Sequence, residues 1–155
     1  LCLHIRILAK NQGRGSRGVT TRPNWGVRAC RHAGSYLSLS RIIEQYCEKH
    51  GLIFHDTEMS DIVTGAKDTL KYFKEKFNVI RPFDLDKSIK PMGSKTNKTK
   101  SYPSGHACQS RLDGLYVTSK IPEHEDGIME AAKECGMGRV LAGFHYLSDY
   151  TSGNL

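Results

Sequence analysis

The first stretch with a regular apolar pattern covers residues 37–50. Its apolar side chains recur at helical spacing, and they are Leu39, Ile42, Ile43 and Tyr46. Gly51 follows directly, and glycine readily adopts the left-handed backbone conformation that ends many helices. The pattern therefore predicts a helix from Leu37 to His50.

A longer apolar stripe follows Ser60, a residue type that caps helix starts well. Its members are spaced along one face over about four turns, and they are Ile62, Val63, Ala66, Leu70, Phe73 and Phe77. A residue before proline is driven out of the helical backbone region, so Arg81-Pro82 is expected to end this second helix.

Residues 83–102 are rich in lysine, serine, threonine and asparagine, with Pro91 and Gly93 among them. That composition is typical of a polar surface loop. Pro103, followed by Ser104 and Gly105, indicates the start of a third helix that continues towards Lys120.

A fourth helix is expected to begin near Pro122 or Glu123 and to run past Cys135. Three glycines should interrupt or end it, namely Gly136, Gly138 and Gly143. Strand patterns are sparse and no internal repeat is visible, so the sequence predicts an all-α fold, a helical bundle.

The length of 155 residues suits one domain, and 38% apolar with 25% charged residues is ordinary for a globular protein. The longest apolar stretches fall far short of the roughly 20 residues that cross a bilayer, so no integral membrane span is expected. The first residue is Leu rather than Met, which favours a fragment. Apolar helical material before residue 60 is thin, and whether the bundle is complete stays open.

Residues 1–35 form a basic, Arg/Gly-rich arm, and residues 36–155 form the predicted helical domain. The arm is interpreted as a solvated or poorly ordered terminus. Nucleic-acid contact is a weaker alternative, because no aromatic residue interleaves with the arginines before Trp25. The formal charge of +7 favours anionic partners without choosing among them.

Neither cysteine nor histidine spacing indicates a metal site. The five cysteines are an odd number without a C-x-x-C pair, so they predict neither a zinc site nor a complete disulfide framework. Five histidines show no ligand spacing and are expected at the surface: His4, His32, His50, His55 and His124.

Three short clusters contain the side chains that could take part in catalysis. Each cluster also has a purely structural explanation. Lys74 and Arg81 could form the polar face of the second helix. The PSGH segment could be a turn and helix cap with an exposed histidine. His145 and Asp149 stand four residues apart and could be an exposed helical pair.

Taken together, the clusters contain what phosphoryl transfer requires. Ser104, Gly105 and His106 lie at a predicted helix N-terminus, where unpaired backbone N–H groups favour an anion. Three further cations can bind phosphate oxygens by charge-assisted hydrogen bonds, and they are Lys74, Arg81 and Arg139.

The chain resembles the type 2 phosphatidic acid phosphatase superfamily, which includes bacterial class A acid phosphatases, membrane lipid phosphatases and vanadium-dependent haloperoxidases. The first family motif appears as KEKFNVIRP from Lys74 to Pro82, and the second as PSGH from Pro103 to His106. The third is matched by Arg139, His145 and Asp149, with Gly138 where serine is usual. The resemblance covers about residues 60–155, and the words SYPSGH and GFHYLSD are most similar to the soluble acid phosphatases.

The resemblance implies a metal-independent phosphomonoesterase, with no cofactor, that acts on a small-molecule phosphate ester. His145 would be the nucleophile, Asp149 would orient it, and His106 would be the general acid and then the general base. Phosphate-binding residues would be Lys74, Arg81, Ser104, Gly105 and Arg139. Activity should peak at acidic to neutral pH, because His145 must be unprotonated while His106 carries a proton.

Two other functions stay open. A vanadium haloperoxidase would hold vanadate as cofactor in the same site, although the chain is short for such enzymes. A nucleic-acid-binding protein with an inactive phosphatase-like domain would use the basic arm. Relatives of the soluble kind are often periplasmic or secreted, but the sequence leaves the compartment and the phosphate ester undecided, and residues 84–100 are the expected rim of the site.

Overall fold

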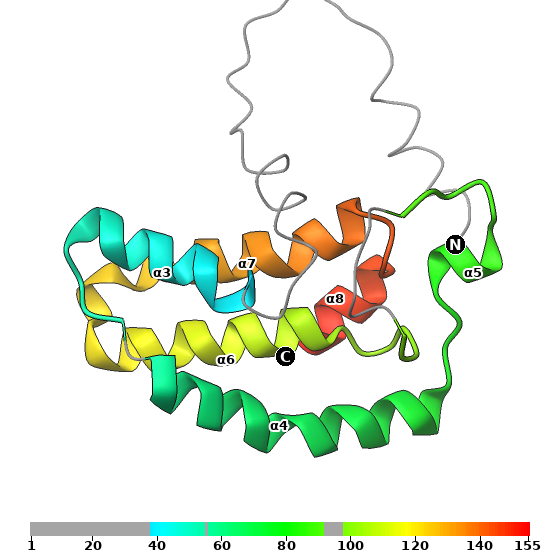
Figure 1. Cartoon of the computed structure of the whole chain (residues 1–155), viewed down its shortest axis with the longest axis horizontal. Helices are drawn as coiled ribbons and strands as arrows, with labels where there is room; N and C mark the ends of the chain where they lie inside the picture. The colour runs from blue at the N-terminus through cyan, green and yellow to red at the C-terminus, as the bar shows by residue number, and fades with distance from the viewer. Residues whose placement is uncertain (1–37, 55, 92–97) are drawn as a thin grey trace, which may run out of the picture.

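The computed structural model describes residues 38–54, 56–91 and 98–155 (Figure 1). These residues form helices and no strand, which confirms the all-α prediction. In chain order the elements are α3 (Ser38–His50), α4 (Asp56–Phe77), α5 (Pro82–Leu85), α6 (Gly105–Lys120), the 3-10 turn η1 (Pro122–His124), α7 (Glu125–Leu141) and α8 (Leu147–Gly153). The predicted arm, residues 1–35, lies outside the described residues.

Helix α6 lies at the centre of the bundle and contacts α3, α4, α7 and α8. In Figure 1, α3 and α7 lie on one side of α6 and α4 lies on the other, while α8 lies near the end where α6 begins. The central position of α6 matters for function, because its N-terminus carries the PSGH segment.

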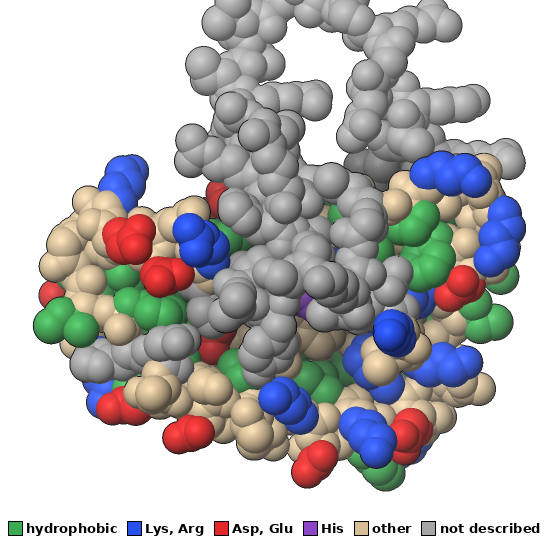
Figure 2. Space-filling view, viewed as in Figure 1, with side chains coloured by type: hydrophobic (Ala, Val, Ile, Leu, Met, Phe, Trp, Pro, Cys, Tyr) green, Lys and Arg blue, Asp and Glu red, His purple; other side chains and the backbone are tan. Residues whose placement is uncertain are grey.

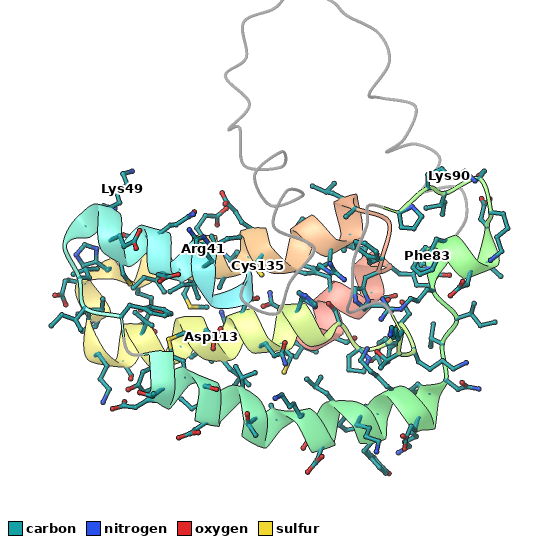
Figure 3. The ribbon with its side chains drawn as sticks, in the orientation of Figure 1. Arg41, Lys49, Phe83, Lys90, Asp113 and Cys135 are labelled. Carbon is teal, nitrogen blue, oxygen red and sulfur yellow. The ribbon has the colours of Figure 1, made fainter. Side chains whose placement is uncertain are left out.

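The main apolar core joins α3, α4, α6 and α7. Its buried members are Ile43, Cys47, Met59, Val117, Ile128, Ala131 and Ala132. Ile43 is fully buried, and burial of such a side chain stabilises the fold by roughly 1.5–3 kcal/mol. Asp113 on α6 and Cys135 on α7, both labelled in Figure 3, are buried as well. Burial, with a smaller contribution from the charge of Asp113, raises the pKa of the Cys135 thiol to about 12.

Helix α3 agrees closely with the first predicted helix. It spans Ser38–His50 and is followed by Gly51 with a φ of 68°, in the left-handed region that glycine adopts without strain. Local pattern and a local stop signal were sufficient here.

Helix α4 differs from its prediction at both ends. It begins at Asp56 rather than after Ser60, and it ends at Phe77, before Arg81. Asn78 ends it by adopting a φ of 50°, a conformation that asparagine tolerates. The proline rule acts further along instead, because Arg81 is the extended N-cap residue of α5 and Pro82 its first residue.

The predicted apolar stripe of α4 is only partly covered. Val63 and Leu70 are buried, but Phe73 is 37% and Phe77 is 50% exposed. Among the described helices, the contacts of α4 are mainly with α6. The outer rings pack on one another instead, and Phe77 meets the ring of Tyr102 edge to face.

Glycines within α7 do not interrupt it, contrary to the prediction. A β-carbon at Gly136 would lie 2.8 Å from the ring of Tyr150 and 3.1 Å from the Cα of Ala107, so glycine allows α6, α7 and α8 to approach closely. Gly143, beyond the end of the helix, has a φ of +80° and turns the chain, as predicted.

Within the described ranges, none of the helices combines the length and the apolar character that a bilayer span needs.

Candidate active site

A cavity of about 660 Å³ opens between α4, the N-terminus of α6 and the segments that precede and follow α5. Five of the residues predicted from the motifs line it, and these are Lys74, Arg81, Gly105, His106 and His145. Three of them are almost inaccessible: Arg81 is 3%, His145 is 4% and His106 is 8% exposed. The cavity therefore has a deep, cationic floor built from all three clusters.

His145 is held between an acid and a cation. Its Nδ1 lies 3.2 Å from Asp149 Oδ2, and its Nε2 lies 3.4 Å from Arg81 Nη1. Because Asp149 Oδ2 accepts and Arg81 Nη1 donates, the arrangement favours the tautomer with the proton on Nδ1 and a lone pair on Nε2. Burial lowers the pKa of His145 to about 4, with Arg81 and Lys74 adding to the effect against the opposing Asp149. The imidazole is therefore neutral at ordinary pH.

Asp149 is buried and charged. Its Oδ2 accepts hydrogen bonds from Ser101 Oγ, from His145 Nδ1 and, at 3.0 Å, from the backbone N–H of Tyr146. Burial alone would raise the pKa of this carboxyl, but the three hydrogen bonds outweigh it and lower the pKa. Asp149 therefore stays ionised and fixes the ring of His145.

Ser101 is the site residue that the sequence did not predict. It is fully buried, its Oγ donates to Asp149, and the same oxygen lies 3.5 Å from His145 Nδ1. It belongs to residues 83–102, predicted as a surface loop, and a serine in a polar segment carries no periodic signal. The backbone bond from Ser101 N–H to Val79 carbonyl oxygen, at 2.9 Å, holds this part of the loop inside.

Carbonyl oxygens hold the two cations of the first motif in place. Arg81 Nε donates to Thr99 O at 2.7 Å, and its Nη1 donates to Phe144 O at 2.9 Å. Lys74 Nζ donates at 2.7 Å to each of two loop carbonyls, those of Lys100 and Pro103. Burial and the nearby Arg81 charge lower the pKa of Lys74 to about 8.

The PSGH segment begins α6 as predicted. Ser104 is the N-cap residue, and its Oγ accepts a hydrogen bond from Ala107 N–H at 3.3 Å. First-turn N–H groups such as those of Gly105 and His106 have no carbonyl partner within a helix. A β-carbon at Gly105 would meet nothing closer than 3.9 Å, so packing of the described residues does not itself require glycine there.

The His106 ring nitrogen Nε2 has no hydrogen-bond partner among the described residues, although it is buried. Burial lowers the pKa of His106 well below its usual range, and the charges of Arg139, His145, Arg81 and Lys74 lower it further. His106 is thus a neutral imidazole beside several cations.

Arg139 occupies a different place from the other cations. It is 2% exposed, does not line the cavity, and its guanidinium carbon lies 4.0 Å from the centre of the Phe144 ring. Burial, followed by the charge of Arg81, lowers the pKa of Arg139 to about 10. Its charge nevertheless reaches the site, because it lowers the pKa of His106.

Two structural alternatives for the clusters are wrong. His145 and Asp149 are buried and not an exposed helical pair, and Arg81 lies in the chain between α4 and α5 rather than on a polar helix face. His106 is also buried, although PSGH does cap a helix. Among the described residues no group of His, Cys, Asp or Glu side chains is arranged to hold a metal ion, and Cys47, Cys108 and Cys135 are free thiols.

Comparison with known proteins adds the family. The model of the PAP2 superfamily matches residues 59–155. A non-specific acid phosphatase of Providencia stuartii is 33% identical over 101 residues, which cover 63% of this chain and 41% of that protein. An acid phosphatase of Zymomonas mobilis is 32% identical over 127 residues, which cover 76% of this chain and 48% of that protein. The chain thus spans less than half the length of these curated relatives.

The fold has a counterpart among solved structures. A crystal structure described as the first transmembrane PAP2 type phosphatidylglycerolphosphate phosphatase, from Bacillus subtilis, superposes with a TM-score of 0.53 at 18% identity. The superposition covers 99% of this chain and 86% of that one, which shows a shared fold. Since the family model covers more than half of the chain and all three motif clusters fall within it, this chain belongs to the PAP2 superfamily.

Proposed function

We propose that this chain carries the active site of a metal-independent phosphatase that hydrolyses small phosphate monoesters through a phosphohistidine on His145. One observation carries the proposal. His145 has one ring nitrogen fixed by a buried carboxylate and the other beside Arg81 on the floor of a cationic cavity. A neutral, oriented imidazole next to a phosphate-binding cation is what nucleophilic attack on phosphorus requires.

In the first step, the Nε2 lone pair of His145 attacks phosphorus in line with the leaving group. The bond from phosphorus to the ester oxygen breaks, and its electron pair goes to that oxygen. The ring becomes cationic, and Asp149 stabilises it through Nδ1–H. In the second step, water attacks the phosphohistidine, and inorganic phosphate and neutral His145 are released.

His106 supplies the proton to the leaving oxygen and later takes one from the attacking water. Without a bound anion it is neutral, because burial and four neighbouring charged or chargeable groups depress its pKa. A phosphate dianion in the cavity would offset those cations, so substrate binding is expected to raise the pKa of His106 towards the value that a general acid needs.

The cationic groups take the part that a metal ion has in other phosphatases. Lys74, Arg81, Gly105 and His106 line the cavity, and Arg139 adds positive charge nearby. Each charge-assisted hydrogen bond to phosphate contributes roughly 1.5–3 kcal/mol. The names of the relatives, two acid phosphatases and one phosphatidylglycerolphosphate phosphatase, support a phosphate ester as substrate.

The test is hydrolysis of 4-nitrophenyl phosphate with a chelator present, by the wild-type chain, His145→Ala and the matched control His50→Ala. His50 is exposed and does not line the cavity. Activity that resists the chelator, survives in the control and disappears in His145→Ala is expected. Vanadate, which adopts the five-coordinate geometry of phosphoryl transfer, should inhibit, and an acid-labile phosphate should be trapped on His145 by rapid quenching.

Activity that the chelator abolishes and a divalent cation restores would contradict the metal-independent mechanism. Unchanged activity in His145→Ala would show that His145 is not the nucleophile. A third outcome is a folded wild-type chain that shows no hydrolysis but oxidises bromide with peroxide once vanadate is added. That result would indicate a haloperoxidase and not a phosphatase.

A further inference from the structure

Four lysines line the cavity without belonging to any of the three motifs: Lys67, Lys71, Lys98 and Lys100. All four are exposed, whereas Arg81, His106 and His145 on the floor are buried, so the lysines surround the mouth. Figure 2 shows blue side chains gathered on the right of the view, over the C-terminal half of α4 and the region of α5. The lining contains two carboxylates against this positive charge, those of Glu75 and Asp84.

Three of the four lysine charges are not neutralised by ion pairs within the described part of the chain. Asp84 pairs with Lys87, outside the lining, at 3.6 Å. Lys71, Lys98 and Lys100 have no carboxylate within salt-bridge distance among the described residues. On α4, Lys71 has Lys67 and Lys74 four and three residues away, the spacings that bring helical side chains together, and it has the carboxylates of Asp68 and Glu75 at the same two spacings.

The spacing on α4 indicates where an anion bound at the mouth would lie. A helix rises 1.5 Å per residue, so Lys71 lies about 4.5 Å and Lys67 about 10 Å from Lys74 along the axis. Lys74 reaches the floor, where it binds the carbonyl of Pro103 just before the α6 N-cap. The second anion would therefore lie one to two helical turns from the phosphoryl group on the floor.

Apolar side chains also line the cavity. Leu70 and Ile80 both line the cavity, and Leu70 is 8% exposed while Ile80 is 52% exposed. They suit an uncharged, hydrocarbon or ring-shaped spacer between two charged ends.

We propose that the preferred substrates carry a second anionic group, such as another phosphate, which the mouth lysines bind while the first phosphate is transferred on the floor. This proposal rests on the proposed function, in which a phosphate group is transferred on the floor of the cavity. It adds that the preferred substrates carry a second anionic group. The net charge of +7 would also draw such multiply charged anions towards the cavity.

The test uses binding, which does not depend on hydrolysis. Benzenephosphonate and benzene-1,4-diphosphonate share one ring and differ by one anionic group, and both resist hydrolysis. Their affinities for the full chain are measured by titration calorimetry at physiological ionic strength. The double variant Lys71→Gln/Lys98→Gln is compared with wild type and with Lys133→Gln, an exposed lysine of α7 outside the lining.

Wild type is expected to bind the diphosphonate roughly tenfold more tightly than the monophosphonate, since two partly exposed charge contacts together give about that factor. The double variant should reduce this preference to about twofold while its monophosphonate affinity stays nearly unchanged. Lys133→Gln should behave as wild type. Raising the salt concentration should weaken the preference, because exposed charges are screened.

Equal wild-type affinities for the two phosphonates would overturn the proposal. A loss in Lys133→Gln at least half as large as that in the double variant would overturn it too, because the control removes one positive charge and the double variant two, and a proportional loss would indicate a general effect of net charge. Hydrolysis of 4-nitrophenyl phosphate together with equal affinities would overturn this proposal and leave the proposed function standing. A clear diphosphonate preference in a folded chain without hydrolysis would support the mouth site and overturn the proposed reaction.

Discussion

The hydrogen bond from Ser101 to Asp149 gives a prediction that separates a charged from a neutral contact in the same core. Ser101 is fully buried and donates to a carboxylate, whereas Ser110 is 1% exposed and donates to the carbonyl oxygen of Ala107 at 3.2 Å. Substitution of either serine by alanine removes one hydroxyl from a buried position. The two variants differ mainly in the charge of the oxygen acceptor, and Ser110 in addition hydrogen-bonds the thiol of Cys135.

The expected magnitudes follow from that difference. Near neutral pH, Ser101→Ala should lower the free energy of unfolding by about 1.5–3 kcal/mol, the usual contribution of a hydrogen bond to a charged group. Ser110→Ala should lower it by about 0.5–1.5 kcal/mol, the usual contribution of a neutral bond.

The pH dependence of the two effects should differ as well. The folded-state pKa of Asp149 is lowered, so its stabilising contribution is present above the unfolded pKa, about 3.9, and is lost as the pH falls through the folded pKa. Ser101→Ala removes part of this contribution. Its cost should therefore be full at pH 5 and above and should shrink below about pH 4, while the cost of Ser110→Ala should stay constant.

Urea unfolding of wild type and both variants at several pH values between 7 and 3 would measure these differences. A cost of Ser101→Ala that is smaller than that of Ser110→Ala near neutral pH, or that does not change in the acid range, would refute the reasoning. It would mean that the hydroxyl contributes nothing to keeping Asp149 charged.

Three further predictions concern the same site and its support. Asp149→Asn should lower kcat roughly ten- to hundredfold, since a bond of about 1.5–3 kcal/mol to the nucleophile is lost, while inhibition by vanadate changes little. As the pH falls, kcat/KM should decrease near the pKa of His145, about 4. The pKa of His106 should be higher in the pH profile of kcat than in that of kcat/KM, because bound phosphate raises it. A β-carbon at Gly153 would clash with the backbone carbonyl oxygen of Ser104, so Gly153→Ala should destabilise the chain by about 1–3 kcal/mol in thermal unfolding, whereas Gly65→Ala, in open space within α4, should stabilise it slightly.

The sequence correctly predicted those structural features that depend on residues close together in the chain. The apolar spacing before Gly51 predicted α3, and the PSGH segment predicted the start of α6, because both depend on a few consecutive residues. The motif residues could be assembled without the fold, since their types and spacings are specific. The cavity brings together Lys74, Arg81, His106 and His145 accordingly.

Features that depend on distant contacts could not be predicted in the same way. Ser101 acquires its role only because the loop folds inward against Val79 and Asp149. Gly136 appeared to be a helix breaker, yet its missing side chain is what lets Tyr150 and Ala107 approach α7. In both cases the chemistry of the residue is unremarkable, and tertiary packing decides its function.

The site combines several cations with few nearby carboxylates, and this charge balance affects the stability of the whole chain. Lys74 has its pKa lowered to about 8 and Arg139 to about 10, so the folded state disfavours their charged forms. A lowered folded pKa means that the unfolded state binds more protons between about pH 8 and the ordinary lysine value of about 10.4. The contribution of Lys74 to stability therefore rises with pH in that window.

A bound phosphate should reverse this pH dependence, because it favours the charged form of Lys74. At a concentration about 100-fold above its dissociation constant, an anion that binds only the folded chain stabilises it by about 2.7 kcal/mol. Because binding favours protonated Lys74, whose pKa is about 8 in the free chain, phosphate should raise the melting temperature most at neutral pH and progressively less above pH 8. Differential scanning calorimetry with phosphate, and with chloride at equal ionic strength, measures both effects. A phosphate-induced shift that equals the chloride shift, or that stays constant from pH 7 to pH 10, would show that anion binding is not linked to the protonation of Lys74.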